Sequence, residues 1–238
     1  MTAIAIIPAR GGSKRIPHKN IKAFHGRPMI AYSIQAALES GLFARVVVST
    51  DDTEIAEAAR GCGAEVPFLR PAALADDHAG TVGVIQHAVG VLREQGEDFA
   101  YACCLYATAP FVTLADLARG LELLENHPDK AYAFTVTDYA SPVQRALRLR
   151  PEGGVESLYP EFHETRSQDL EPAFHDAGQF YWGRTEAWAQ GAPLHAPHSL
   201  PVRLPRHRVQ DIDTLEDWQR AELLYGALLT GPRRSCAS

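Results

Sequence analysis

Residues 4–20 read Ile-Ala-Ile-Ile-Pro-Ala-Arg-Gly-Gly-Ser-Lys-Arg-Ile-Pro-His-Lys-Asn. The apolar run at 4–7 predicts a buried strand that ends at Pro8 and leads into a loop rich in glycine and basic residues. Such a loop gathers backbone N–H groups and cations at one place, which suits a polyphosphate. The composition therefore favours phosphate binding over an ordinary basic loop. A Walker A spacing and a Gly-x-Gly-x-x-Gly motif are both absent after this strand.

The residues of this loop have two predicted uses. Small residues allow the backbone to approach a phosphate closely, and these are Gly11, Gly12 and Ser13. Basic side chains supply the positive charge, and these are Arg10, Lys14, Arg15 and Lys19.

The first half of the chain alternates strand-like with helix-like segments. Apolar runs predict strands at 3–8, 45–50, 101–107 and 132–137, and helical spacing predicts helices near 30–38, 55–59, 84–92 and 114–124. This alternation predicts an α/β, Rossmann-like domain of three layers, with a mostly parallel sheet between helices. Ligands of such sheets bind at the carboxyl ends of the strands, where the loop at 9–20 would lie.

Residues 138–175 interrupt this alternation with prolines, glycines and short strand-like pieces. We interpret them as a small arm inserted into the domain, and we expect the arm to make the subunit contact of a homodimer. Regular structure returns at 178–183 and in a last helix that starts at Thr214. The domain is therefore expected to span residues 1–229, followed by a polar tail at 230–238.

Composition limits the function further. The 238 residues are 46% hydrophobic and carry a net charge of −6, so a small anionic ligand is a better expectation than nucleic acid. The four cysteines lack a Cys-x-x-Cys spacing, which argues against a zinc site or a disulfide framework. We find no run of about 18 apolar residues and no signal peptide, so we expect a cytoplasmic protein without a membrane partner.

A pair of acidic residues is the second strong feature of the chain. Asp211-Ile212-Asp213 places both carboxylates on one side if the backbone is extended. The pattern fits either a Mg²⁺ site or a solvated loop that precedes a helix. The phosphate loop elsewhere in the chain favours the metal.

Other polar residues have less specific patterns. Asp52 follows the second strand and is expected first of all to cap a helix, although this segment could also hold a substrate. Arg166 is suited to a bidentate pair with a carboxylate. His175 and Asp176 fit either acid–base chemistry or a structural hydrogen bond. No spacing indicates the catalytic triad of a hydrolase.

Six segments together resemble the CMP-sialic acid synthetase family of cytidylyltransferases. They occur in the family's order and the resemblance covers about residues 3–226; the segments are 7–20, 48–52, 67–71, 108–110, 166–170 and 210–214. The resemblance implies a nucleotidyltransferase domain. It also implies a reaction in which the anomeric hydroxyl of a nine-carbon sugar acid attacks the α-phosphorus of CTP and pyrophosphate leaves.

The resemblance also implies roles for individual residues. The catalytic residues would be Arg10, Lys19 and Asp211. The nucleotide would be bound by Ala9, Arg10, Gly11, Gly12, Ser13, Lys14, Lys19, Asn20, Asp77 and Thr81. The sugar acid would be bound by Tyr106, Thr108, Arg166, Gln168, Asp169 and Gln179. Mg²⁺ would be held by Asp211 and Asp213.

One departure from the family's pattern concerns the sugar. The segments 101–110 and 165–182 resemble the subgroup that uses pseudaminic acid. Sialic acid enzymes typically have glutamine where this chain has Tyr106, which argues against N-acetylneuraminic acid as the substrate. A phenol is compatible with the more apolar surface of that sugar. Legionaminic, N-acetylneuraminic and ketodeoxyoctonic acids are the alternative substrates, and a catalytically silent nucleotide-binding protein is the alternative from another class.

Overall fold

The computed structural model describes residues 2–75 and 80–230. The strands are β1 (Ala3–Pro8), β2 (Ala23–Phe24), β3 (Arg27–Pro28), β4 (Arg45–Ser49), β5 (Tyr101–Leu105), β6 (Tyr132–Asp138), β7 (Leu147–Leu149), β8 (Val155–Ser157), β9 (Phe174–Arg184) and β10 (Ser199–Arg203). The α-helices are α1 (Met29–Ser40), α2 (Thr53–Gly61), α3 (Thr81–Glu94), α4 (Leu114–Asn126), α5 (Thr185–Ala189) and α6 (Leu215–Thr230). Short 3-10 helices lie at Ala72–Leu74, Val143–Arg145, Pro160–Phe162, Ser167–Asp169 and Arg206–Arg208.

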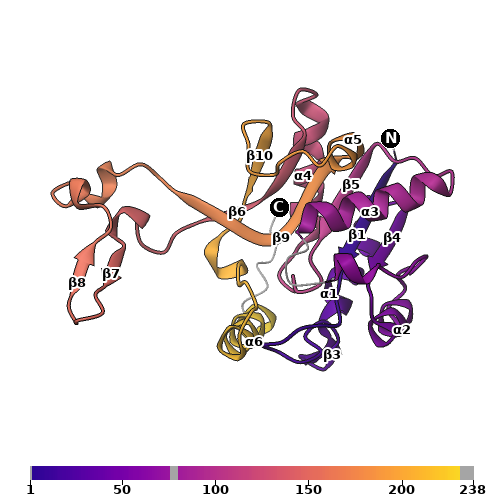
Figure 1. Ribbon diagram of the computed structural model, residues 1–238, viewed down its shortest axis with the longest axis horizontal. Helices are drawn as coiled ribbons and strands as arrows, with labels where there is room; N and C mark the ends of the chain where they lie inside the picture. Colours follow the sequence, from indigo (N-terminus) through magenta and orange to yellow (C-terminus); the bar gives the residue numbers. More distant parts are fainter. Residues whose placement is uncertain (1, 76–79, 231–238) are drawn as a thin grey trace, which may run out of the picture.

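A six-stranded sheet forms the centre of the molecule, in the order β10-β6-β9-β5-β1-β4 (Figure 1). β1 is parallel to β4 and β5, and β10 is parallel to β6. The predicted, mostly parallel sheet is thereby confirmed. β9 is antiparallel to both of its neighbours, which the sequence did not indicate.

Helices cover both faces of the sheet, as the alternation predicted. Apolar residues of α1, α2 and α4 pack on one face, where Ile34, Ile55 and Leu117 are buried. Residues of α3 and α5 pack on the other face, where Ile85 and Trp188 are buried. The strand residues between them are apolar on both sides because both sides are covered.

α6 closes the carboxyl edge of the sheet through a third, smaller apolar cluster. Trp218 of α6 packs with Phe24 and Ile16, which belong to the segment after β1. The predicted last helix is α6, and Thr214 caps its start in a reciprocal pair: Asp217 N–H donates to Thr214 Oγ1 at 3.2 Å, and Thr214 N–H donates to Asp217 Oδ2 at 2.8 Å. This cluster fixes the start of α6 beside the basic loop.

Two strands end earlier than predicted. β5 ends at Leu105 and β4 at Ser49, so Tyr106 and Thr50 lie just beyond the sheet. Tyr106 N–H still donates to the Gln179 carbonyl at 2.9 Å. Thr50 and Leu69 form an isolated β-bridge. This bridge brings Arg70, the residue after Leu69, to the carboxyl end of β4.

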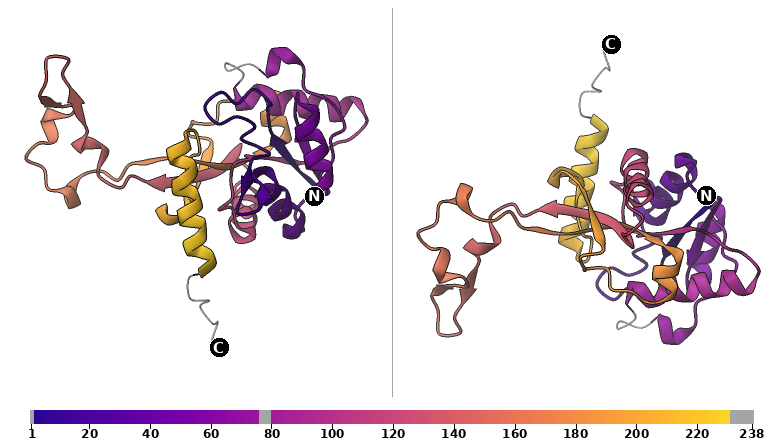
Figure 2. Two further views of the ribbon diagram at one scale, coloured as in Figure 1. Left: turned by 90° about the horizontal axis from the view of Figure 1, so that it is seen from below. Right: turned by 90° about the horizontal axis from the view of Figure 1, so that it is seen from above.

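The segment between β6 and β9 extends away from the rest of the molecule (Figures 1 and 2). It contains the antiparallel hairpin β7–β8 and three of the 3-10 helices. Sheet pairing reaches Asp138 and Phe174, so the arm proper comprises residues 139–173. Large apolar side chains of the hairpin are exposed, with Leu147 at 59%, Val155 at 64% and Leu149 at 79%.

None of the helices in the described ranges combines the length and the apolar character that a membrane crossing requires. Cys103 and Cys104 are buried in β5. Most of the predicted tail at 230–238 lies outside the described residues.

Candidate active site

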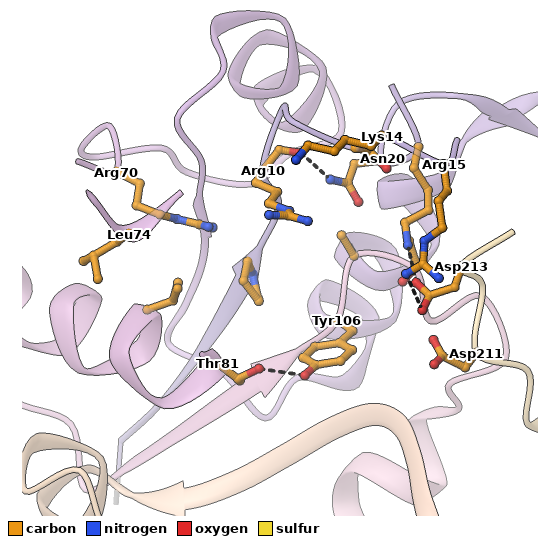
Figure 3. Close-up of a pocket in the computed structure, with 16 residues that line it drawn as sticks. Arg10, Lys14, Arg15, Asn20, Arg70, Leu74, Thr81, Tyr106, Asp211 and Asp213 are labelled. Carbon is orange, nitrogen blue, oxygen red and sulfur yellow. Dashed lines mark hydrogen bonds and ion pairs between the residues drawn. The ribbon is translucent and has the colours of Figure 1, made fainter. Parts of the chain in front are cut away.

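A cavity of about 620 Å³ opens at the carboxyl ends of β1 and β5. The loop after β1, the segment around Arg70, the start of α3, the segment after β5 and the segment before α6 all contribute to it (Figure 3). Its lining residues are Pro8, Arg10, Ser13, Lys14, Arg15, Lys19, Asn20, Arg70, Leu74, Thr81, Val84, Tyr106, Ala107, Thr108, Asp211 and Asp213.

Basic side chains, among them Arg10, Lys14 and Arg70, line the part of the cavity that lies at the top of Figure 3. Five of the lining side chains are cationic and two are anionic. Arg70 is only 6% exposed, and its guanidinium donates to the carbonyl of Ser49 and, at 3.2 Å, to the Ser49 hydroxyl. Burial lowers the pKa of Arg70, with a smaller contribution from the charge of Arg10. A concentrated positive field of this kind attracts a polyanion.

The basic loop is held in shape by its own polar groups. Asn20 is buried, and its Nδ2 donates to the Arg10 carbonyl at 2.9 Å, which ties the end of the loop to its start. Gly11 N–H donates to Asp51 Oδ1 at 3.1 Å. A Cβ on Gly11 would lie 2.4 Å from Asp52 Oδ2, so only glycine fits there. Asp52 caps α2, as predicted, by accepting from Glu54 N–H and Ile55 N–H.

The Asp211-Ile212-Asp213 segment lies beside this loop. Ile212 is buried in the α6 cluster while both aspartates line the cavity, as expected for an extended segment. Lys19 Nζ donates to the Ile212 carbonyl at 2.6 Å and to Asp213 Oδ1 at 3.3 Å. Arg15 also pairs with Asp213, at 2.9 Å. The two sequence features that pointed to phosphate and metal are therefore parts of one site.

The aspartate pair fits a magnesium ion that is shared with a substrate. Burial, with the neighbouring charge of Asp213, raises the pKa of Asp211, and a cation would relieve this repulsion. No group of three or more His, Cys, Asp and Glu side chains that could hold a metal occurs in ranges 2–75 and 80–230. Mg²⁺ commonly binds through one or two carboxylates together with water and substrate phosphates, so two aspartates are sufficient.

The wall opposite the cations is formed by less polar groups. The Tyr106 and Thr81 hydroxyls are 2.7 Å apart, and Leu74 and Val84 are also among the lining residues. Ser33 Oγ donates to the Tyr106 carbonyl at 2.7 Å, which fixes the backbone of this residue. Burial raises the pKa of Tyr106 to about 12, so its phenol is neutral near pH 7.

The cavity gathers most of the residues that the sequence had singled out. Those that line it are Arg10, Ser13, Lys14, Lys19, Asn20, Thr81, Tyr106, Thr108, Asp211 and Asp213. The other singled-out residues with described positions are not in the lining. Ala9, Gly11 and Gly12 belong to the loop itself, and Gln179 is buried in β9. Arg166, Gln168 and Asp169 lie on the arm. Asp77 lies outside the described residues.

The placement of Arg166 differs from the sequence-based expectation. Its guanidinium pairs with Asp169 at 2.7 Å within the arm instead of reaching the cavity of its own chain. Arg70, Leu74 and Val84 were not predicted for the site. Residues 67–71 were among the segments that resemble the family, but neither that resemblance nor the pattern of the segment assigned Arg70 to a ligand.

The chain is similar to known cytidylyltransferases. The family described as Cytidylyltransferase matches residues 4–148. The pseudaminic acid cytidylyltransferase of Campylobacter jejuni subsp. jejuni serotype O:2 is 44% identical over 94% of this chain and 97% of the relative. The CMP-N,N'-diacetyllegionaminic acid synthase of Legionella pneumophila subsp. pneumophila is 40% identical over 94% and 96%.

The fold is also found among solved structures. A CMP:2-keto-3-deoxy-manno-octonic acid synthetase complexed with CTP matches with a TM-score of 0.69 and 19% identity, over 96% of this chain and all of the other. At this identity the likeness concerns the fold alone.

Proposed function

Since the chain belongs to the cytidylyltransferase family, we propose that it transfers CMP from CTP to the anomeric hydroxyl of pseudaminic acid. The hydroxyl oxygen forms a bond to the α-phosphorus, the bond from that phosphorus to the bridging oxygen of the β-phosphate breaks, and pyrophosphate leaves. The observation that carries the proposal is that the cationic loop, Asp211 and Asp213 all line the same cavity. The relatives named for pseudaminic acid support the choice of sugar.

The cations of the cavity are suited to hold and neutralise a triphosphate. Arg10, Lys14 and Lys19 come from one loop, and Arg70 contributes from the segment after α2. Transfer of a phosphoryl group relies mainly on positioning and on stabilisation of charge, not on a nucleophile from the protein. Cys103 and Cys104 do not change this, because both are buried and burial raises their pKa values.

Asp211 and Asp213 would hold Mg²⁺ against the triphosphate. The ion, when bound, supplies positive charge that polarises the phosphoryl oxygens. The contribution of the chain itself is to keep the two carboxylates in place through buried Ile212 and through the contacts of Lys19 and Arg15 with Asp213. We place this activity in the cytoplasm, since the three described cysteines are free thiols.

The proposed reaction is tested by pyrophosphate release with CTP and Mg²⁺ on three sugar acids in parallel. We expect release with pseudaminic acid and much slower release with legionaminic and N-acetylneuraminic acids, because Tyr106 presents a phenol to the sugar. Preference for another acid would retain the reaction and overturn the choice of sugar. Absence of release from folded protein with all three would favour a silent nucleotide-binding protein.

We further propose that the arm at 139–173 joins two copies of the chain. The β7–β8 hairpin exposes Leu147, Leu149 and Val155, and a two-stranded hairpin is marginally stable when it stands alone. If the arm of one protomer covers the cavity of its partner, Arg166 and Gln168 come to the sugar acid from the other chain. This arrangement would reconcile their position on the arm with the role that the sequence suggested.

Sedimentation velocity tests the arm as a dimer contact. We expect a dimer at micromolar concentration, and a monomer when residues 144–160 are replaced by a short glycine linker. Replacement of exposed Leu223 on α6 by serine is the matched control and should leave the dimer intact. A wild-type monomer would contradict the proposal.

Mixing of two inactive variants tests whether the cavity is completed by the partner. Arg166→Ala and Asp211→Ala, each inactive, are expected to recover roughly a quarter of wild-type activity after they are mixed and allowed to exchange subunits. About half of the dimers are then mixed, and each of these has one intact site. No recovery from subunits that do exchange would mean that Arg166 does not act across the dimer.

A further inference from the structure

A series of side-chain contacts connects Tyr106, in the lining of the cavity, with Asp176. The Tyr106 hydroxyl lies 2.7 Å from the Thr81 hydroxyl. The Tyr106 ring packs against that of Tyr181, with 5.3 Å between ring centroids. The Tyr181 hydroxyl donates to Asp176 Oδ2 at 2.8 Å. Asp176 does not line the cavity, but it is connected to the cavity through Tyr181 and Tyr106.

An irregularity in the backbone of β9 allows the contact between Tyr181 and Asp176. Residues five apart in a regular strand lie about 17 Å apart and face opposite sides of the sheet. Between the pairs Phe134↔Tyr181 and Val136↔Asp176, β9 holds three more residues than β6. This bulge contains Gly178 at φ +61°, and Gly178 N–H donates to Asp176 Oδ1 at 2.8 Å. The bulge therefore brings Asp176 back to the Tyr181 hydroxyl.

The Tyr181 side chain depends on this carboxylate. The Tyr181 ring contacts the rings of Tyr106 and Phe134, and it stacks on Phe134 with 5.8 Å between the ring centroids. Only 4% of Tyr181 is exposed. A buried phenol without a partner is costly, and Asp176 is the acceptor that the described contacts give it. His195 Nε2 lies 3.3 Å from the same Oδ2, so the carboxylate has three neighbours that hold it in place.

We propose that Asp176 is a positioning residue for recognition of the sugar acid, acting through Tyr181 on Tyr106. The inference rests on the proposed function and concerns the wall of the cavity opposite the phosphate-binding cations. Loss of the carboxylate frees the Tyr181 phenol, and the Tyr106 ring then loses the surface against which it is packed. The basic loop and Asp211 have no part in these contacts. Thr81 meets Tyr106 through its hydroxyl, but its backbone is held as the first residue of α3, so KM for CTP is expected to change little.

Steady-state kinetics of Asp176→Ala, Tyr181→Phe and the double variant test the proposal. Each single variant should raise KM for the sugar acid about tenfold, the scale of one lost hydrogen bond to a charged group. KM for CTP should stay within about twofold of wild type. The double variant should be no worse than the more impaired single variant, because both changes break the same connection.

The controls separate positioning from a general loss of structure. Asp138→Ala removes an exposed carboxylate from the end of β6, and should change neither KM. Asp176→Asn keeps one acceptor and should recover part of the sugar-acid affinity; it also replaces the alanine variant if that variant does not fold. Equal rises in both KM values, or additive effects in the double variant, would overturn the proposal. A wild-type protein inactive towards every sugar acid would instead refute the proposed function.

Discussion

Asp211→Ala is expected to abolish CMP transfer while leaving the fold intact. Asp211 lines the cavity and contributes to no apolar cluster, so its removal leaves the packing of α6 unchanged. If it holds Mg²⁺ with Asp213, the loss removes several kcal/mol of stabilisation from the developing phosphate charge. At about 1.4 kcal/mol for each factor of ten, kcat should fall more than about 1,000-fold.

Two measurements and one control variant accompany Asp211→Ala. Calorimetry of Mg²⁺ in the presence of CTP should show binding to wild type and a large loss in Asp211→Ala, independently of turnover. Glu216→Ala, an exposed acidic residue at the start of α6, is the control and should retain both binding and activity. Thermal melts should show that both variants are folded. Near-wild-type activity of folded Asp211→Ala would remove this residue from the metal site.

The second large effect is expected at Arg10. Arg10 follows the last residues of β1 and lines the cavity between Asn20 and Arg70, so a triphosphate held there lies within its reach (Figure 3). A preorganised cation that stabilises transition-state charge is typically worth a factor of about 100 or more. We therefore expect Arg10→Ala to lower kcat/KM for CTP at least about 100-fold.

The size of this loss distinguishes a catalytic cation from a general electrostatic effect. Arg119→Ala, on the exposed side of α4 where Arg119 pairs with Glu122, removes the same charge far from the cavity and should have little effect. Arg10→Lys restores a charge without the planar fork and should be intermediate. A loss of less than about threefold in folded Arg10→Ala would contradict a role in charge stabilisation.

Local patterns were sufficient to predict the basic loop after β1 and the extended aspartate pair, both of which line the cavity. The buried run of β1 fixed the start of the loop, and Ile212 had to alternate with its two acidic neighbours because it packs under α6. Both signals depend on a few consecutive residues. The rule that ligands bind at the carboxyl ends of the strands located the loop. The position of the aspartate pair beside the loop is a finding of the structure.

Other parts of the site depend on contacts between distant segments. Arg70 reaches the cavity through a single bridge between Thr50 and Leu69, which no periodicity reveals. β9 follows the long arm and is antiparallel to both of its neighbours, a direction that no local pattern in the sequence indicates. The contact of Asp176 with Tyr181 requires a bulge, whereas regular strand spacing places the two on opposite faces.

The most direct test of the central proposal follows one oxygen atom. Pseudaminic acid labelled with ¹⁸O at the anomeric hydroxyl is incubated with CTP, Mg²⁺ and the enzyme, and the product is examined by phosphorus NMR. Attack of that hydroxyl on the α-phosphorus predicts a CMP-sugar whose bridging oxygen carries the label, with unlabelled pyrophosphate. A product without the label at phosphorus, or no product from folded protein, would contradict CMP transfer in this cavity.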